Sequence, residues 1–199
     1  MYTIDKPYEN LIEIKKSKFI SYAFPVDNQV EVLDILQKLR KEHKEATHVC
    51  FAYVLNSPNL EKASDDGEPD GTAGKPILDV IKKNNLHDIL VIVVRYFGGI
   101  KLGAGGLVRA YSTSAGDVVK QCRIGYTKLM TEFQIITEIK NSKSLLEILR
   151  KSSVEVSNQI YTDKFIVNIY AENIDFLNNS SLQFDVNVIQ KTKVFYDKN

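Results

Sequence analysis

The sequence predicts an α+β protein made of two domains. Glycine and proline give the first indication, because nine of the ten glycines lie between Gly67 and Gly116 and all five prolines precede residue 77. The second indication is the order of elements after residue 129, where strand and helix patterns follow one another closely. The change in composition places the boundary near residue 128, so we expect one domain over residues 1–128 and another over 129–199.

The first domain mixes helices with strands. Apolar runs and alternation predict strands, and apolar residues at helical spacing predict helices. In chain order we expect a strand over 17–26, a helix over 29–43, a strand over 47–55, a loop over 57–75, a helix over 76–85, a strand over 88–97 and a helix over 106–122. The first helix is amphipathic, with Val32, Ile35, Leu36 and Leu39 on one face, and Pro76 suits the first turn of the second helix.

The segment DILVIVVRYF, residues 88–97, is the most apolar strand pattern in the chain. Strands that are buried on both faces have continuous apolar runs of this kind, whereas half-exposed strands alternate. We therefore expect this strand to lie at the centre of the first sheet.

The second domain has elements in the order βαββαβ. We expect strands over 131–140, 154–162, 164–171 and 185–196, a helix over 143–153, and a short, weakly patterned helix over 173–182. This order is typical of the split βαβ, ferredoxin-like fold. Enzymes, RNA binders and regulatory modules share that fold, so it does not identify a function.

The segment VVRYFGGIKLGAGGLVRAYS, residues 93–112, leads from the apolar strand into a helix. Glycines let the backbone approach a ligand closely, and the first N–H groups of a helix point outward with partial positive charge. With three interleaved cations, the pattern favours an anion-binding site formed by Arg95, Tyr96, Lys101, Gly103, Gly105, Gly106 and Arg109. The spacing matches neither the Walker nor the dinucleotide pattern. The alternative hypothesis is that the glycines only permit tight turns and close packing.

A second loop, SDDGEPDGTAGKP, places four carboxylates within six residues. Its charged residues are Asp65, Asp66, Glu68, Asp70 and Lys75. We predict first that these acids pair with the cations of the glycine segment, and specifically that Asp65 or Asp66 comes within salt-bridge reach of one. A solvated acidic turn is the second hypothesis. A divalent-metal site is the third, because the spacing does not match an EF-hand.

His48 and Cys50 alternate on the strand over 47–55, so their side chains share a face. A Cys–His nucleophilic pair is one interpretation, but spacing alone does not activate a thiol, and a packed histidine is favoured. Three histidines in the chain complete no zinc pattern. Tyr96, Phe97 and Tyr111 flank the cations and suit stacking on unpaired bases, although aromatics beside a buried strand are more often core residues.

Composition excludes several classes of protein. A formal net charge of +1 gives no global basic field, so anion binding must come from a local patch. No stretch approaches the ~20 apolar residues that a membrane helix needs, and no signal peptide is recognisable. Two cysteines are too few for a disulfide framework. We therefore expect a cytoplasmic protein without membrane contact.

The motifs resemble those of the Impact/YigZ family. SDDGEPDGTAGKPILDV and VVRYFGGIKLGAGGLVRAYS carry the resemblance, and ATHVCFAYV and KKSKFISYAFPV match as well. The likeness covers residues 1–128, and the remainder is similar to the C-terminal domain of bacterial and archaeal members. It implies an N-terminal fold similar to domain 2 of ribosomal protein S5. Asp70 is a departure, because many members have serine there.

The resemblance also implies a role in translation. The family has no established enzymatic activity, and its relatives with a known role act in translational control during amino-acid starvation, by binding the activator of an initiation-factor kinase. Those relatives carry an additional N-terminal interaction domain. This sequence begins directly with the Impact domain, so we do not expect that partner here.

These observations predict a non-enzymatic protein that binds RNA or a ribosome-associated factor through the glycine segment, with a possible protein partner on the C-terminal domain. We expect no cofactor and no metal ion. The main alternative is an enzyme that acts on a phosphorylated small molecule or nucleotide, with Asp65 or Asp66 as metal ligand or base. The third hypothesis is a protein-interaction module without an anion site.

Overall fold

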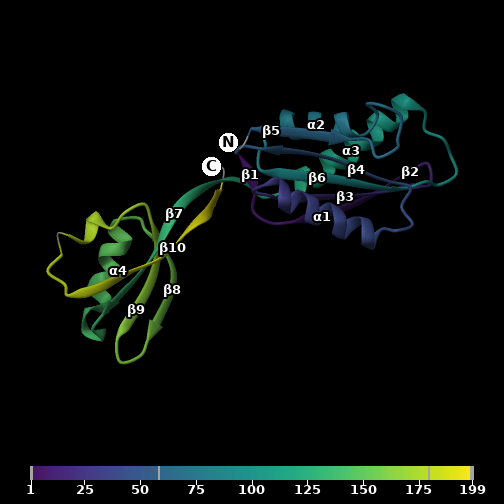
Figure 1. The fold of residues 1–199 in the computed structure, drawn as a ribbon. Coiled ribbons are helices and arrows are strands. Elements are labelled where there is room, and N and C mark those ends of the chain that lie inside the picture. Colours follow the sequence, from purple (N-terminus) through teal and green to yellow (C-terminus); the bar gives the residue numbers. More distant parts are fainter. Residues whose placement is uncertain (1, 58, 179, 198–199) are drawn as a thin grey trace. The chain divides into compact units, whose positions relative to one another are not determined.

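The computed structural model describes residues 2–57, 59–178 and 180–197. It confirms a mixed α and β architecture built on two sheets (Figure 1). The chain divides into two compact units, one up to Tyr126 together with Asp197 and the other from Thr127 to Tyr196.

The first unit is built on an antiparallel sheet with the central strand that the sequence predicts. Its strands lie in the order β2 (Tyr8–Ile14), β3 (Ser17–Pro25), β6 (Ile89–Tyr96), β4 (His48–Leu55) and β5 (Leu60–Ser64). Alternate residues of β6 enter two separate cores: Ile89, Val91 and Val93 point to one face of the sheet. Leu90 and Ile92 point to the other, so both faces of the strand are buried.

Three helices cover the two faces of this sheet. Helix α1 (Gln29–Glu42) lies on one face, and α2 (Gly74–Lys83) and α3 (Ala104–Gln121) lie on the other (Figure 1). The Asn28 side chain caps α1 by accepting from the backbone N–H groups of Val30 and Glu31, both at 3.0 Å. The cap accounts for where α1 begins, and the apolar faces account for how the helices pack on the sheet.

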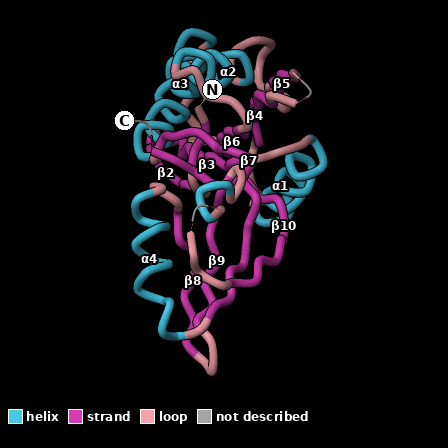
Figure 2. The backbone as a smooth tube through the Cα atoms, turned by 90° about the vertical axis from the view of Figure 1, so that its left-hand side faces the viewer, coloured by secondary structure: helices cyan, strands magenta, loops and turns pink. Residues whose placement is uncertain are grey.

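The second unit is a sheet backed by one helix (Figure 2). Its elements are β7 (Ile124–Thr137), α4 (Ser142–Lys151), β8 (Glu155–Tyr161), β9 (Phe165–Ala171) and β10 (Phe184–Asp197), with short 3₁₀ turns at Ile139–Asn141 and Asp175–Leu177. The strand order is β10-β7-β9-β8. Leu145 and Leu149 of α4 pack into the core of this sheet. The start of β7 also pairs with the short β1 (Thr3–Ile4).

The structure corrects the sequence predictions at several elements. Strand β1 was not predicted, and β7 begins at Ile124 instead of residue 131. Strand β5 occupies part of the expected loop over 57–75, and β2 lies where the sequence analysis assigned no element. Both are edge strands with many polar residues, which weakens their apolar signal. The expected helix over 173–182 is a single turn, because local bonds such as that from the Asp175 N–H to Asn173 compete with a helix.

Candidate anion-binding site

The glycine segment links β6 to α3. Gly98 lies against the backbone of Lys16, where an added Cβ would come within 1.9 Å of the carbonyl oxygen. Gly103, the residue before α3, has a φ of +71°, a left-handed conformation that favours glycine. At Gly105, in contrast, an added Cβ would meet no described atom within 4 Å beyond its chain neighbours and the backbone of its own helix. Tight packing and turn geometry therefore account for Gly98 and Gly103 but not for Gly105.

The N-terminus of α3 is open. The first helical hydrogen bond runs from the Leu107 N–H to the Gly103 carbonyl oxygen at 2.9 Å, which leaves the N–H groups of residues 104–106 without an intrahelical acceptor. Gly103 has no side chain that could cap them. Lys101 is exposed just before the helix, and Arg109 is exposed farther along it. The helix dipole and Lys101 both favour an anion at this position.

Arg95 lies in a different environment from the other two cations. It is 5% exposed, and its guanidinium donates to Glu68 Oε1 at 2.6 Å. The guanidinium carbon lies over the rings of Phe19 and Phe97, at 5.4 and 5.5 Å from their centroids. Its Nε is buried and has no hydrogen-bond partner in the described part of the chain. Arg95 is thus held in an ion pair instead of being presented to solvent.

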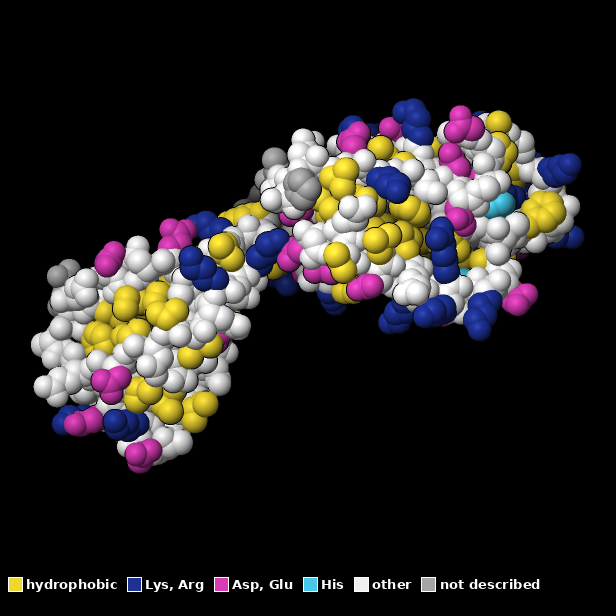
Figure 3. Space-filling view, in the orientation of Figure 1, with side chains coloured by type: hydrophobic (Ala, Val, Ile, Leu, Met, Phe, Trp, Pro, Cys, Tyr) yellow, Lys and Arg dark blue, Asp and Glu magenta, His cyan; other side chains and the backbone are white. Residues whose placement is uncertain are grey.

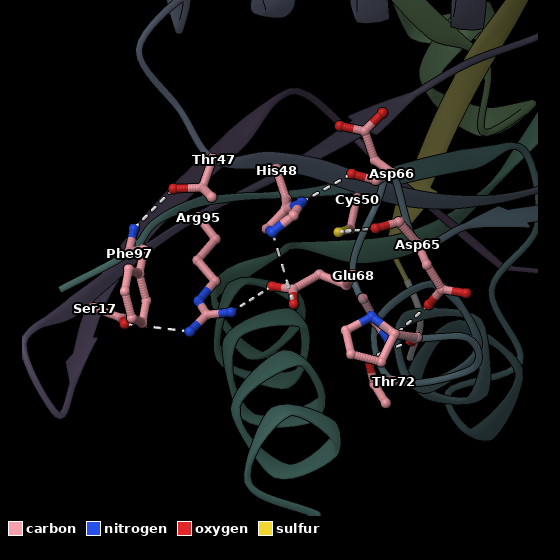
Figure 4. A network of polar contacts seen from close by, with 12 residues as sticks. Ser17, Thr47, His48, Cys50, Asp65, Asp66, Glu68, Thr72, Arg95 and Phe97 are labelled. Atoms are coloured by element: carbon pink, nitrogen blue, oxygen red, sulfur yellow. Dashed lines mark hydrogen bonds and ion pairs between the residues drawn. The ribbon is translucent and has the colours of Figure 1, made fainter. Parts of the chain in front are cut away.

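Glu68 is the centre of a buried polar network (Figure 4). Its Oε1 also accepts from the Tyr111 hydroxyl at 2.8 Å, and its Oε2 lies 3.8 Å from His48 Nε2. His48 Nδ1 donates to the Asp66 backbone carbonyl at 2.9 Å, since a carbonyl oxygen can only accept. Burial raises the pKa of Tyr111, so its phenol stays a donor. The network joins the acidic loop to β4, β6 and α3.

Asp65 closes the N-terminus of α2. Its carboxylate accepts from the backbone N–H groups of Gly71, Ala73 and Gly74 at 3.0, 2.8 and 2.8 Å. Burial alone would raise the pKa of this carboxyl, but the three N–H donors outweigh it and hold the pKa below the ordinary value of 3.8. The protein therefore fills this helix end with an anion of its own.

Asp66 pairs with α1 and not with the glycine segment. Its Oδ1 accepts from Arg40 at 2.7 Å, and its Oδ2 accepts from the backbone N–H of Val49 at 2.7 Å. The prediction that Asp65 or Asp66 pairs with a cation of the glycine segment is therefore wrong. The expected charge pairing occurs at Glu68 instead, because the loop turns that side chain inward while Asp65 turns back to its own backbone.

The other charged residues of the acidic loop lie outside the network. Asp70 is exposed, and Lys75 is exposed and forms an ion pair with Asp79 at 3.4 Å. The loop carboxylates thus point toward different partners. Among the residues that the structure describes, no group of three or more His, Cys, Asp or Glu side chains could hold a metal ion.

Cys50 is a core residue. It is fully buried, and its Sγ donates to the Asp65 backbone carbonyl at 2.9 Å. Burial raises the pKa of the thiol to about 12, which disfavours the thiolate that nucleophilic catalysis requires. The neighbouring His48 is engaged by the acidic loop, so the structure contradicts the Cys–His pair and supports the packed interpretation.

Tyr96 lies on the opposite face of β6 from Arg95. Its hydroxyl bonds to His43 Nδ1 at 2.8 Å, and the other ring nitrogen of His43 bonds to the Tyr22 hydroxyl at 2.9 Å. Successive residues of a strand point to opposite faces, so this separation follows from their adjacency. The structure does not bring Tyr96 together with the cations of the glycine segment.

A cavity of about 370 Å³ lies where the glycine segment meets the acidic loop. Its lining comprises Thr47, His48, Glu68, Pro69, Arg95, Phe97, Lys101, Leu102, Gly103, Ala104 and Leu107. The cavity thus unites Arg95, Lys101 and Gly103 of the predicted site, whereas Gly105, Gly106 and Arg109 lie on α3 beyond its lining. The sequence analysis did not name Thr47 or Leu102 as site residues. Both lie just outside the helices and strands, so the alternation of side chains along a strand, which places His48, could not have identified them.

Comparison with known proteins identifies relatives over most of the chain. Residues 15–119 match the Impact N-terminal domain. The IMPACT family member YvyE of Bacillus subtilis is 38% identical over 189 residues, which cover 89% of this chain and 87% of that protein. The IMPACT family member YigZ of Escherichia coli is 35% identical over 75% of this chain and 74% of that protein.

One solved structure, a crystal structure of a hypothetical protein, matches 95% of this chain and 97% of its own, with a TM-score of 0.63 and 28% identity. In the described part of this chain, no helix has the length and apolar character needed to cross a membrane. Since a family domain matches more than half of the chain and relatives match most of it, the chain belongs to the Impact family.

Proposed function

We propose that this protein binds RNA by holding a phosphate group at the N-terminus of α3. The observation that carries the proposal is the open first turn of α3, whose N–H groups over residues 104–106 lie beside the exposed Lys101. A phosphate supplies the charge and acceptor oxygens that such a helix end favours. Phe97, 47% exposed on the adjoining cavity wall, offers a ring on which an unpaired base can stack.

The state of the reactive side chains favours binding over catalysis. Cys50 is buried with a raised pKa. Glu68 accepts from Arg95 and Tyr111, and His48 lies between the Asp66 carbonyl and Glu68, so neither is free to activate a nucleophile. Turnover of a phosphorylated compound by the purified protein would instead support the enzyme hypothesis.

Family membership supports a partner in the translation apparatus. Members of the Impact family with a known role act in translational control, and an RNA or a ribosome-associated factor is the partner that a phosphate-binding site would serve there. A protein partner on the second unit remains part of the proposal, because β8 is an exposed strand at the edge of its sheet.

We also propose the finer fold of each unit. The order β10-β7-β9-β8, with α4 between β7 and β8 in the chain, supports a ferredoxin-like fold for the second unit. A fold similar to domain 2 of ribosomal protein S5 is proposed for the first unit. The proposed boundary lies between residues 128 and 129, and limited proteolysis tests it: a stable fragment ending near residue 128 is expected.

A salt titration of RNA binding tests the proposed function. The wild type is compared with a Lys101→Ala, Arg109→Ala variant and with a Lys41→Ala, Lys44→Ala control, on one single-stranded oligoribonucleotide. All four substituted cations are exposed. The control removes the same charge from the C-terminal end of α1, where dark-blue Lys and Arg side chains also gather (Figure 3). The two variants therefore have the same net charge, and a difference between them reports the position of the cations.

We expect the first variant to bind more weakly and to lose roughly one to two units of salt slope, while the control changes much less. The fold should survive in both, because solvated cations contribute little to stability. Equal losses in the two variants would indicate a diffuse electrostatic field. Unchanged affinity and slope in the first variant would refute the phosphate site.

A further inference from the structure

We propose that the cavity beside α3 holds the 5′-terminal nucleotide of a single-stranded RNA, with its 5′-phosphate on the N-terminus of α3 and its base inside the cavity. This inference rests on the proposed function, because it specifies which phosphate of the RNA the site takes.

The size and lining of the cavity fit one nucleotide. Its volume of about 370 Å³ is near the lower end of pockets that enclose small ligands, which is roughly 300–1,000 Å³. Pro69, Phe97, Leu102 and Leu107 supply an apolar lining for the faces of a base. A base within a duplex is stacked on both sides and cannot enter, so the occupant is an unpaired residue.

The charges around the cavity are segregated. Lys101 and the first turn of α3 supply positive charge on one side. Glu68 lies on the lining as well, 8% exposed, and its charge is balanced by Arg95. A second anionic group near Glu68 would be repelled by its carboxylate, and Arg95 could not attract that group because it is already paired with Glu68. The part of the ligand that enters the cavity is therefore uncharged, as a base is, and the anionic group lies at α3, as the 5′-phosphate of the same nucleotide would.

The donors at α3 match a terminal phosphate better than an internal one. Three N–H groups, those of residues 104–106, have no intrahelical acceptor, and Lys101 adds a formal charge. A terminal phosphate monoester carries about −1.5 to −2 charge and three free oxygens. An internal phosphodiester carries only one negative charge, so the helix end and Lys101 attract it less strongly than they attract the doubly charged monoester.

Arg95 gives an independent indication that a ligand enters. Its side chain lines the cavity and is 6% exposed, yet its Nε–H has no acceptor among the described residues. Buried donors are nearly always paired, so an unpaired one calls for an explanation. The exposed ring of Phe97 lies over this guanidinium. A base that displaces the Phe97 ring and enters edge-on could place a ring nitrogen or carbonyl oxygen in the plane of the guanidinium, where it would accept from the unpaired N–H.

The test compares 5′-phosphorylated and 5′-hydroxyl single-stranded oligoribonucleotides of one sequence, each with a fluorophore at the 3′ end. Fluorescence anisotropy at constant salt measures their affinities for the full chain. The variants are Lys101→Ala, with Lys83→Ala as an exposed control on α2, and Phe97→Leu, with Phe97→Trp as the variant that keeps an aromatic ring. Circular dichroism confirms that each variant is folded.

We expect the wild type and the Lys83→Ala control to bind the phosphorylated RNA about tenfold more tightly. Lys101→Ala should reduce this preference. Phe97→Leu should weaken the binding of both RNAs without changing the preference for the phosphorylated RNA, whereas Phe97→Trp should bind both RNAs as tightly as the wild type does. Equal wild-type affinities that still depend on Lys101 would overturn this inference and leave the proposed function standing. A preference that Lys101→Ala leaves intact would also overturn it, and no binding of either RNA would refute both proposals.

Discussion

The N-termini of α2 and α3 lie in the same unit and on the same face of its sheet, but they differ in how their N–H groups are satisfied. At α2, the Asp65 carboxylate accepts from the N–H groups of Ala73 and Gly74. At α3, Gly103 precedes the helix and offers no side chain, and the nearest charged residue before it is the cation Lys101. One helix end carries an anion that belongs to the chain, while the other is arranged to receive one from outside.

The glycines at the two helix ends differ in the same way. An added Cβ at Gly74 would come within 2.6 Å of the Ser64 backbone nitrogen, so glycine is required by packing at α2. At Gly105 the space is open. A glycine-rich approach to a helix can therefore have two roles. Two observations distinguish these roles: the Asp65 carboxylate occupies the N-terminus of α2, and the space at Gly105 in α3 is open.

The largest expected effect comes from breaking the ion pair between Glu68 and Arg95. Glu68 lies in the segment before α2, and Arg95 lies in the segment before α3. Glu68→Gln leaves Arg95 charged at a position that is 5% exposed. Removing one partner of a buried pair costs about 3–5 kcal/mol, and urea unfolding should show a loss of that size. The control is Glu61→Gln, whose exposed pair with Lys82 is worth about 0–1 kcal/mol. Similar losses in both variants would mean that Arg95 is solvated.

The next effect tests whether α2 depends on its internal anion. Asp65→Ala removes the acceptor of three backbone N–H groups and should destabilise the protein by about 2 kcal/mol, at the upper end of helix-cap substitutions. Asp65→Asn keeps one acceptor oxygen and should lose less. The exposed Asp70→Ala serves as a control and should stay within about 0.5 kcal/mol of the wild type. Chemical denaturation of all three gives the ranking, and an Asp65→Ala value equal to the control would contradict it.

The pH dependence of stability isolates the charge of this cap. The pKa of Asp65 is lowered on folding, so its contribution is present above the unfolded pKa and is lost as pH falls through the folded pKa. The difference in unfolding free energy between wild type and Asp65→Asn should therefore be constant from pH 7 to about pH 5 and shrink below about pH 4. Unfolding curves at these pH values measure it. A difference that grows on acidification would show that the carboxyl is bound in its neutral form.

Sequence patterns predicted the fold where apolar residues dominate. The central position of β6 followed from its continuous apolar run, and α1 followed from its apolar face. Strand β5 was missed, because Glu61, Lys62 and Ser64 make an edge strand resemble a polar loop. Edge strands bury little surface, so their formation depends on backbone pairing that side-chain patterns do not record.

The candidate site was predicted less completely than the fold. The open end of α3 was inferred from its glycines, and the pairing of the acidic loop with a cation was inferred from charge. Which acid pairs with Arg95 depends on how the loop turns, and the turn at Asp66, with a φ of +45°, is set by tertiary contacts. Strand alternation would have separated Tyr96 from Arg95, and this signal was available in the sequence.

The last prediction gives α3 an anion of its own, as α2 has. Gly105→Asp places a carboxylate in the first turn of α3, where an added Cβ meets no described atom within 4 Å beyond its chain neighbours and the backbone of its own helix. The charge should stabilise the helix end by about 0.3–1 kcal/mol, with a further gain from replacing a helical glycine. The same carboxylate should repel a phosphate, so the variant should be slightly more stable than the wild type yet bind RNA at least about tenfold more weakly.

Gly105→Ala is the matched control, because it gains about 0.5–1 kcal/mol of helix stability without adding charge. Thermal unfolding and anisotropy with the 5′-phosphorylated oligoribonucleotide measure the two properties. If alanine abolishes binding as strongly as aspartate, the close approach of a ligand to bare backbone matters more than charge. If the aspartate variant binds like the wild type, the anion does not lie at α3, and the contrast between the two helix ends has no bearing on function. A gain in stability together with a loss of binding in the aspartate variant alone is the result that only an external anion at this helix end explains.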